Sequence, residues 1–121
     1  MVYFITGRAH SGKTTTAFQL AWHLSKKGKT VLMLDGDQVR NLIPTGFSNL
    51  DRYNHIMRIA AFAAIAEAQG ITPIIALMAP KKAWRQQARE LFKKSKLIYR
   101  PGGTLWENTV YEEPDKEELN A

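Results

Sequence analysis

Eight residues near the start of the sequence have the types and spacing of a phosphate-binding loop. Residues 7–14 read Gly-Arg-Ala-His-Ser-Gly-Lys-Thr, which fits G-x-x-x-x-G-K-[ST], and they follow the apolar run 2–5. In such a loop, backbone N–H groups surround the β-phosphate of a nucleotide, the lysine contacts the β- and γ-phosphate oxygens, and the next hydroxyl binds Mg²⁺. The pattern therefore predicts Lys13 as catalytic and Thr14 as a metal ligand. The predicted nucleotide-binding residues are Gly7, Ser11, Gly12, Lys13, Thr14 and Thr15.

Two carboxylates and an arginine form a second group of candidate functional residues. Asp35, Asp37 and Arg40 follow the apolar run 30–34, and α/β sheets bind ligands at the carboxyl ends of their strands. Asp35 is suited to bind Mg²⁺ or to accept a proton from an attacking hydroxyl, and Asp37 with Arg40 is suited to hold a polar substrate. Residues 35–37 are also typical of a plain turn that carries an N-cap for the next short helix. Both interpretations stay open at this point.

Strand-like and helical runs alternate along the chain and place both groups at one edge of a predicted sheet. The alternation predicts an α/β fold: a P-loop NTPase-type three-layer sandwich with a small, mostly parallel central sheet. The helix over 13–27 begins at the phosphate loop, so its positive dipole end faces the phosphates. The strands are expected at 2–6, 30–34, 72–78 and 96–99, and the helices at 13–27, 51–69 and 81–93.

The later part of the chain supports two further structural expectations. Residues 51–69 are rich in alanine and apolar on most sides, so this helix is expected to pack against the sheet and to end at Gly70. The Pro-Gly-Gly run 101–103 indicates a turn, after which 104–111 is expected to form a short strand or an extended tail. Trp106 lies in that segment, placed either to contact an adenine ring or to pack at an exposed edge.

Length and composition fit one domain, 1–121, of an ordinary globular protein. The sequence has 121 residues, 45% of them hydrophobic and 23% charged. Its apolar runs are shorter than the ~20 residues that span a bilayer, and the absence of cysteine excludes disulfides and thiolate metal sites. The first strand is expected at the N-terminus with no signal peptide before it. We therefore expect a cytoplasmic protein that does not bind a membrane.

The net charge of +6 is unevenly distributed. Segment 81–100 carries eight basic residues against the single acid Glu90, whereas 107–118 carries six acids against Lys116. The basic segment favours either a polyanionic partner, nucleic acid included, or a helix face paired with the acidic tail. Charge alone does not decide between these interpretations.

Taken together, the motifs resemble those of the adenylylsulfate kinase family, small P-loop kinases that phosphorylate the 3′ hydroxyl of adenylylsulfate. The resemblance covers most of the chain and is far more specific than the phosphate loop alone. Its ordered pieces are the loop 7–14, Leu34-Asp35-Gly36-Asp37 with Arg40, Gly46-Phe47-Ser48 with Asp51-Arg52, Arg58-Ile59-Ala60, Ala79-Pro80, Arg85 with Ala88-Arg89, and Tyr111-Glu112-Glu113-Pro114 with Glu118-Leu119.

The resemblance implies an ATP- and Mg²⁺-dependent phosphotransferase that acts on an alcohol group of a small anionic acceptor. By position, it makes Asp35 the catalytic base or a metal carboxylate beside Thr14. An aromatic ring at Phe47 is suited to stack on a flat ring, and the arginines are suited to bind phosphate or sulfate oxygens. The implied acceptor-binding residues are Asp37, Arg40, Phe47 and Arg52, with His55 at the position where the family has an asparagine.

The sequence also departs from the family pattern. Residues 79–82 read Ala-Pro-Lys-Lys where the family usually has Ser-Pro-Tyr-Arg, so a hydroxyl and a ring near the acceptor pocket are missing. Between Arg89 and Tyr111 the family carries a basic lid that excludes water. This lid and the family's last strand are expected to be missing here. The sheet is expected to keep about four strands, and its exposed edge is a place for a second subunit, so a homo-oligomer is expected.

These observations leave three functional hypotheses. The first is a kinase that moves the γ-phosphate of ATP to a hydroxyl of a small nucleotide-like acceptor, for which the resemblance suggests adenylylsulfate. The second is a kinase for a hydroxyl of a nucleotide or of modified nucleic acid, favoured by the basic segment 81–100 and the reduced lid. The third is a non-catalytic nucleotide-binding module, favoured by the missing lid and strand.

Overall fold

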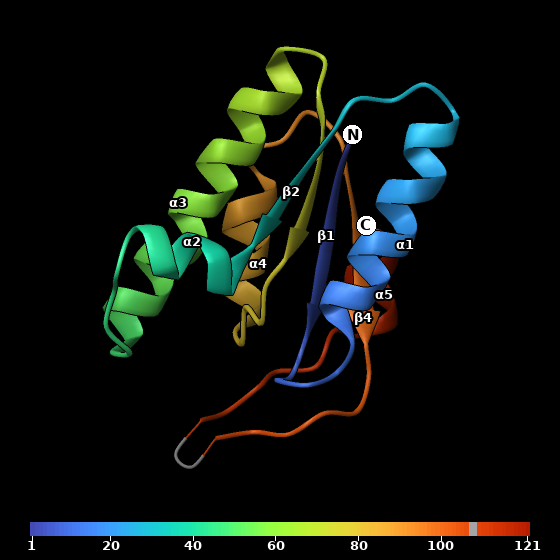
Figure 1. Ribbon diagram of the computed structural model, residues 1–121. Coiled ribbons are helices and arrows are strands. Elements are labelled where there is room, and N and C mark those ends of the chain that lie inside the picture. Colours follow the sequence, from blue (N-terminus) through green and yellow to red (C-terminus); the bar gives the residue numbers. More distant parts are fainter. Residues whose placement is uncertain (107–108) are drawn as a thin grey trace.

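Four parallel strands in the order β2-β3-β1-β4 form the centre of the fold (Figure 1). The computed structural model describes residues 1–106 and 109–121. This arrangement confirms the predicted α/β fold with a small, mostly parallel sheet. The elements are β1 (Val2–Gly7), α1 (Lys13–Lys26), β2 (Val31–Asp35), α2 (Gly36–Leu42), α3 (Asn49–Ala68), β3 (Thr72–Ala76), α4 (Lys82–Arg89), β4 (Ser95–Arg100) and α5 (Lys116–Asn120).

The alternation of side chains along β1 explains the three layers. Val2 and Phe4 point to the face covered by α3 and α4, and Tyr3 and Ile5 point to the face covered by α1. Figure 1 shows α1 on one side of the sheet and α3 with α4 on the other. All of β1 except Tyr3 is buried, so the strand that leads into the phosphate loop is held firmly from both sides.

Short-range capping fixes where the helices begin. Gly12 has a positive φ of 94° immediately before α1, a conformation that favours glycine. The Ser48 side chain accepts from the Asp51 N–H, and the Asp51 carboxylate accepts from the Ser48 N–H, which is a capping box at the start of α3. Asp35 caps α2. As expected, α3 packs against the sheet and is followed by Gly70, whose φ is 82°.

Several predicted element ends were wrong, each for a local reason. β3 ends at Ala76 rather than at residue 78; the Leu77 N–H still donates to the Ile5 carbonyl of β1, and the extended backbone does not continue through Ala79, whose φ is 45°. α4 ends at Arg89 rather than at residue 93, because the chain turns there and buries Phe92 in the core before β4 begins. The predicted strand or tail 104–111 contains residues 107 and 108, which lie outside the described residues.

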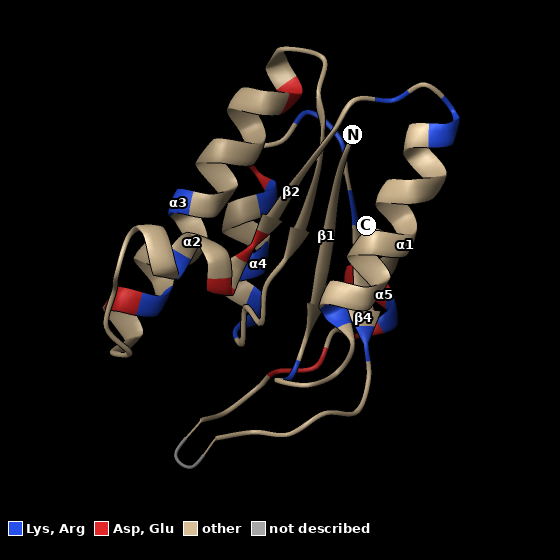
Figure 2. Cartoon of the chain, viewed as in Figure 1, with Lys and Arg blue, Asp and Glu red and all other residues tan. Residues whose placement is uncertain are grey.

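Two residues of the basic segment form ion pairs with the acidic tail, in line with the second of the two charge interpretations. Arg85 of α4 forms an ion pair with Glu118 of α5 at 2.7 Å, and Lys82 forms one with Asp115 at 3.3 Å. Figure 2 shows the charged positions of α4 and of the tail. Within the described part of the chain, no helix is long and apolar enough to cross a membrane.

Candidate nucleotide-binding and transfer site

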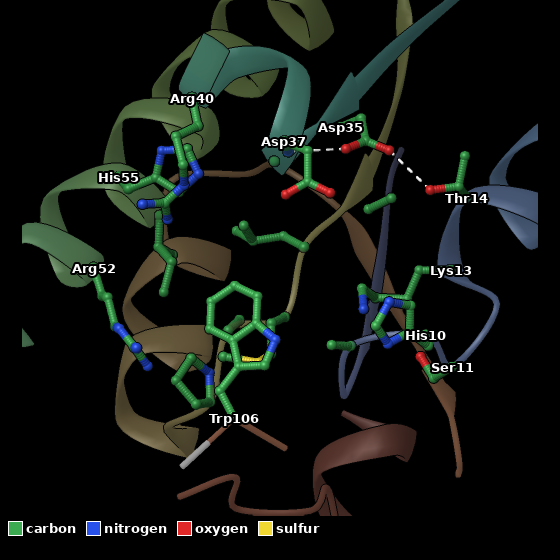
Figure 3. A pocket seen from close by; sticks show the side chains of 18 of the residues that line it. His10, Ser11, Lys13, Thr14, Asp35, Asp37, Arg40, Arg52, His55 and Trp106 are labelled. Carbon is green, nitrogen blue, oxygen red and sulfur yellow. Dashed lines mark hydrogen bonds between the residues drawn. The ribbon is translucent and has the colours of Figure 1, made fainter. Parts of the chain in front are cut away.

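A cavity of about 480 Å³ lies at the carboxyl ends of the strands, where the phosphate loop meets α2 and α3. Figure 3 shows Lys13 and Thr14 on one side of it and Arg40, Arg52 and His55 on the other. Gly7 is the one predicted site residue that does not line the cavity. The predicted residues that line it are Ser11, Gly12, Lys13, Thr14, Thr15, Asp35, Asp37, Arg40, Phe47, Arg52 and His55.

The ammonium group of Lys13 is held over the phosphate loop by backbone oxygens. Its Nζ donates to the carbonyls of Gly7 at 3.0 Å and Arg8 at 2.7 Å. Burial lowers the pKa of Lys13, and the nearby carboxylates of Asp37 and Asp35 oppose that shift. Gly7 thus contributes its carbonyl to the position of Lys13, although its own atoms lie outside the cavity.

The carboxylate of Asp35 joins the loop to α2. Its Oδ1 accepts from the backbone N–H of Asp37 and its Oδ2 accepts from the Thr14 hydroxyl, both at 2.9 Å (Figure 3). The interpretation of residues 35–37 as a turn with a helix N-cap is therefore confirmed, with Asp35 as the cap. It does not exclude a role in the cavity, because the second oxygen faces the loop. The sequence placed Asp35 and Thr14 in the same predicted metal site, and the structure brings the two side chains together.

Aromatic rings and guanidinium groups gather at the far end of the cavity. The Phe47 ring is 58% exposed, and the Cζ atoms of Arg40 and Arg52 lie 4.6 and 6.0 Å from its centroid. The Trp106 ring meets it edge to face, with the centroids 6.1 Å apart. Such a group has apolar ring faces for a flat heterocycle and cations for an anionic substituent.

His55 forms part of the cavity wall beside α2. It is buried, and in the part of the chain that the structure describes its Nδ1 has no hydrogen-bond partner. Burial lowers the pKa of His55, and the positive charges of Arg40 and Arg58 lower it further. We therefore expect a neutral imidazole at neutral pH, as suits a site that already holds two arginines.

Residues 101–106, which we call the crossing segment, pass along the phosphate loop and end at the far side of the cavity. The Thr104 N–H donates to the Ala9 carbonyl at 2.8 Å, and the Thr104 hydroxyl lies 3.1 Å from Nδ1 of His10. Two residues later, Trp106 lines the cavity and meets Phe47. The structure therefore places Trp106 at the cavity. The predicted turn marked this segment, but nothing in the sequence showed where it would go.

Replacing Gly103 with alanine is expected to weaken nucleotide binding. A Cβ at this position would collide with the Ala9 carbonyl and lie 3.1 Å from the Ser11 nitrogen, so the loop would have to shift. Gly102→Ala is a matched control, because Gly102 has a similar positive φ but nothing within 4 Å of its Cβ position. Calorimetric titration with ATP measures the effect. Equal affinities for the two variants would contradict the expected contact between segment and loop.

The fold and the loop define the class of the protein. A parallel sheet with this loop between β1 and α1 is a P-loop fold of the kind found in small kinases. The solved structure of Mycobacterium tuberculosis APS kinase CysC in complex with AMPPNP and APS has the same fold, with a TM-score of 0.77 at 24% identity over 83% of this chain and 61% of that one. The structure of the hexameric APS kinase from Thiobacillus denitrificans has a TM-score of 0.74 at 31% identity, over 81% of this chain and 21% of that one.

The chain belongs to the adenylylsulphate kinase family, whose family model matches residues 1–100. A probable adenylyl-sulfate kinase of Archaeoglobus fulgidus is 38% identical over 100 residues, which are 81% of this chain and 64% of that protein. A probable adenylyl-sulfate kinase of Bacillus subtilis is 39% identical over 92 residues, 74% of this chain and 47% of that protein. The chain thus spans about half to two thirds of these relatives.

Proposed function

We propose that this protein is a kinase that transfers the γ-phosphate of ATP to a hydroxyl of a small nucleotide-like acceptor, with adenylylsulfate as the favoured acceptor. The observation that carries the proposal is that one cavity contains both the phosphate loop and the group around Phe47, with Asp35 between them. The names of the relatives support the choice of acceptor.

At the donor end, the loop binds the polyphosphate. Backbone N–H groups at the start of α1 and the Lys13 ammonium neutralise the phosphate oxygens. Within the described residues, no three His, Cys, Asp or Glu side chains form a metal cluster. The Thr14 hydroxyl and the Asp35 carboxylate are hard oxygen ligands that suit Mg²⁺, a metal that proteins usually hold with few side chains and the phosphates. When bound, Mg²⁺ offsets the negative charge that develops on the transferred group.

Asp35 is the residue we assign to the proton of the attacking hydroxyl. As the acceptor oxygen forms its bond to the γ-phosphorus, the bond from that phosphorus to the bridging β-phosphate oxygen breaks and ADP leaves. The proton of the hydroxyl passes to a carboxylate oxygen of Asp35. The hydrogen bonds from Thr14 and Asp37 hold this carboxylate in one orientation between the donor and acceptor ends.

At the acceptor end, the rings of Phe47 and Trp106 are assigned to the purine, and Arg40 and Arg52 to the anionic group attached to it. An arginine presents several N–H donors in one plane, which matches the oxygens of a phosphate or sulfate. Asp37 and His55, which also line the cavity, are assigned to polar contacts with the acceptor.

Transfer of labelled γ-phosphate from Mg-ATP tests the proposal directly. The acceptors are adenylylsulfate, free nucleosides and nucleotides, and DNA with a modified hydroxyl, and Lys13→Ala serves as the blank. Label on adenylylsulfate would support the proposal as stated, and label on another nucleotide would keep the kinase but change the acceptor. ATP binding without transfer to any acceptor would instead indicate the non-catalytic nucleotide-binding module.

Phe47→Ala is expected to raise the KM for adenylylsulfate roughly 5- to 150-fold, because base stacking on an aromatic ring is worth ~1–3 kcal/mol. The KM for ATP should stay nearly unchanged, since Phe47 lies at the acceptor end. Leu50→Ala is the control, a similarly exposed apolar residue close in sequence that does not line the cavity. Steady-state kinetics with each substrate varied in turn gives both constants. Equal changes in the two constants would contradict the assignment.

A nucleic-acid acceptor has a different signature, because its binding would fall steeply with salt. The pairing of Arg85 and Lys82 with acidic side chains leaves less positive charge on segment 81–100 than its composition suggests. The homo-oligomer and the cytoplasmic location stay predictions.

A further inference from the structure

Three consecutive carbonyls in the cavity wall are each held by a different part of the chain. We call residues 78–80, which line the cavity, the wall segment. The Met78 carbonyl accepts from the Thr6 hydroxyl of β1, the Ala79 carbonyl from Arg85 Nη1 at 2.8 Å, and the Pro80 carbonyl from the Glu112 N–H at 2.7 Å. The wall segment therefore has a fixed backbone, although it belongs to no helix or strand.

The backbone of Ala79 needs this support. Its φ of 45° lies in the left-handed region, which costs a residue with a side chain free energy that glycine avoids. Ala79 is almost fully buried, and such conformations persist only where the surroundings determine them. The donor that reaches its carbonyl is the Arg85 guanidinium, so this side chain is the direct restraint on the turn.

Arg85 is fully buried and forms an ion pair with Glu118. Its Nε donates to Glu118 Oε1 at 2.7 Å, and its Nη2 donates to Glu118 Oε2 at 3.1 Å and to the Glu112 carbonyl at 2.8 Å. A buried ion pair often adds no stability compared with apolar side chains of similar volume. The pair does hold a hydrogen-bond donor, Arg85 Nη1, in a fixed position next to the Ala79 carbonyl of the wall segment.

We propose that Arg85 and Glu118 are positioning residues for acceptor binding, which act by fixing the wall segment. The proposal rests on the proposed function, because the acceptor is the molecule that the wall segment would contact. It also assigns a role to the tail: Glu112 and Glu118 hold the wall segment from outside the cavity, directly or through Arg85. The Tyr111 hydroxyl supports the same arrangement, because it lies 2.9 Å from the Thr6 hydroxyl of β1, which donates to the Met78 carbonyl.

The test replaces both charges at once, with the double variant Arg85→Met, Glu118→Leu. Removing the pair leaves no uncompensated buried charge, and the carbonyls of Ala79 and Glu112 lose their donor. Lys82→Met is the matched control, because it removes the exposed ion pair that links the same helix to the tail. Arg85→Lys is a second variant that keeps a positive charge beside Glu118 but removes the Nη1 donor to the Ala79 carbonyl, for use if the double variant does not fold.

Two measurements follow on each folded variant. Amide hydrogen exchange is expected to become at least tenfold faster in peptides that cover the wall segment, with the phosphate-loop peptide unchanged. Calorimetric titration with adenylylsulfate in the presence of ADP is expected to show at least tenfold weaker acceptor binding, with ADP affinity unchanged. Lys82→Met should change neither.

The outcomes separate this inference from the proposed function. Unchanged exchange in the wall segment would overturn the inference, as would faster exchange with unchanged acceptor affinity. If the parent protein does not bind adenylylsulfate at all, the proposed acceptor is wrong and the inference about acceptor binding falls with it. Slower transfer with equal losses of affinity for ATP and for the acceptor would show a general structural role, which also overturns the inference.

Discussion

The Asp35→Asn variant is expected to lose phosphate transfer while it keeps its affinity for ATP. Asparagine has nearly the same shape as aspartate, so it can still accept from the Asp37 N–H and keep α2 capped. Its amide cannot accept a proton at neutral pH. Because a positioned general base contributes roughly 10²–10⁴-fold, we expect a fall in kcat of at least ~100-fold, measured with labelled ATP under saturating acceptor.

The control for this variant is Asp51→Asn, which changes the carboxylate that caps α3 and does not line the cavity. It should transfer phosphate at close to the parent rate. Calorimetric titration with ATP gives the donor affinity of each variant. If Asp35→Asn transferred phosphate nearly as fast as the parent, the carboxylate would be a helix cap alone. If neither the parent nor the variant transferred phosphate, the non-catalytic binding module would be favoured instead.

Lys13→Ala is expected to weaken ATP binding and to abolish measurable transfer. The variant removes the ammonium that the carbonyls of Gly7 and Arg8 now hold over the loop. A hydrogen bond to a charged group is worth about 1.5–3 kcal/mol, so losing one such bond to the phosphates weakens binding roughly 10- to 150-fold. The charge also stabilises the transition state, where removing one such donor costs ~10²–10³-fold in rate.

Lys29→Ala provides the comparison, because Lys29 is exposed beyond the opposite end of α1. ATP affinity and single-turnover transfer should match the parent protein. A Lys13→Ala variant that bound ATP as tightly as the parent would show that the phosphates do not occupy the loop, and the donor site would have to be sought elsewhere.

Much of the donor end was predictable from the sequence, because its information is local. The spacing of Gly12, Lys13 and Thr14 fixes the loop, and the apolar run before it gives β1. The prediction that Asp35 lies near Thr14 needed one more step, namely that the parallel strands of one sheet end at the same edge. The order of the four strands was not predicted, since nothing in the residues of β4 shows which strand it pairs with.

The acceptor end was less predictable, because its walls come from distant parts of the chain. Arg85 was counted in a basic segment, and only the structure shows that it is buried against Glu118. Trp106 was left between two interpretations, because a turn at 101–103 does not say where the chain goes next. Nothing in the residues around Arg85 or Glu118 indicates that the two side chains will be buried together.

The long separation between Thr6 and Tyr111, 105 residues apart in the chain, has a consequence for biosynthesis. A ribosome makes β1 first, yet one partner of its Thr6 hydroxyl, Tyr111, is made after all four strands. Arg85 likewise has no counterion until Glu118 has been translated. The nascent chain can therefore form the phosphate loop and the sheet early, whereas the acceptor side of the cavity must wait until the acidic tail has left the ribosome.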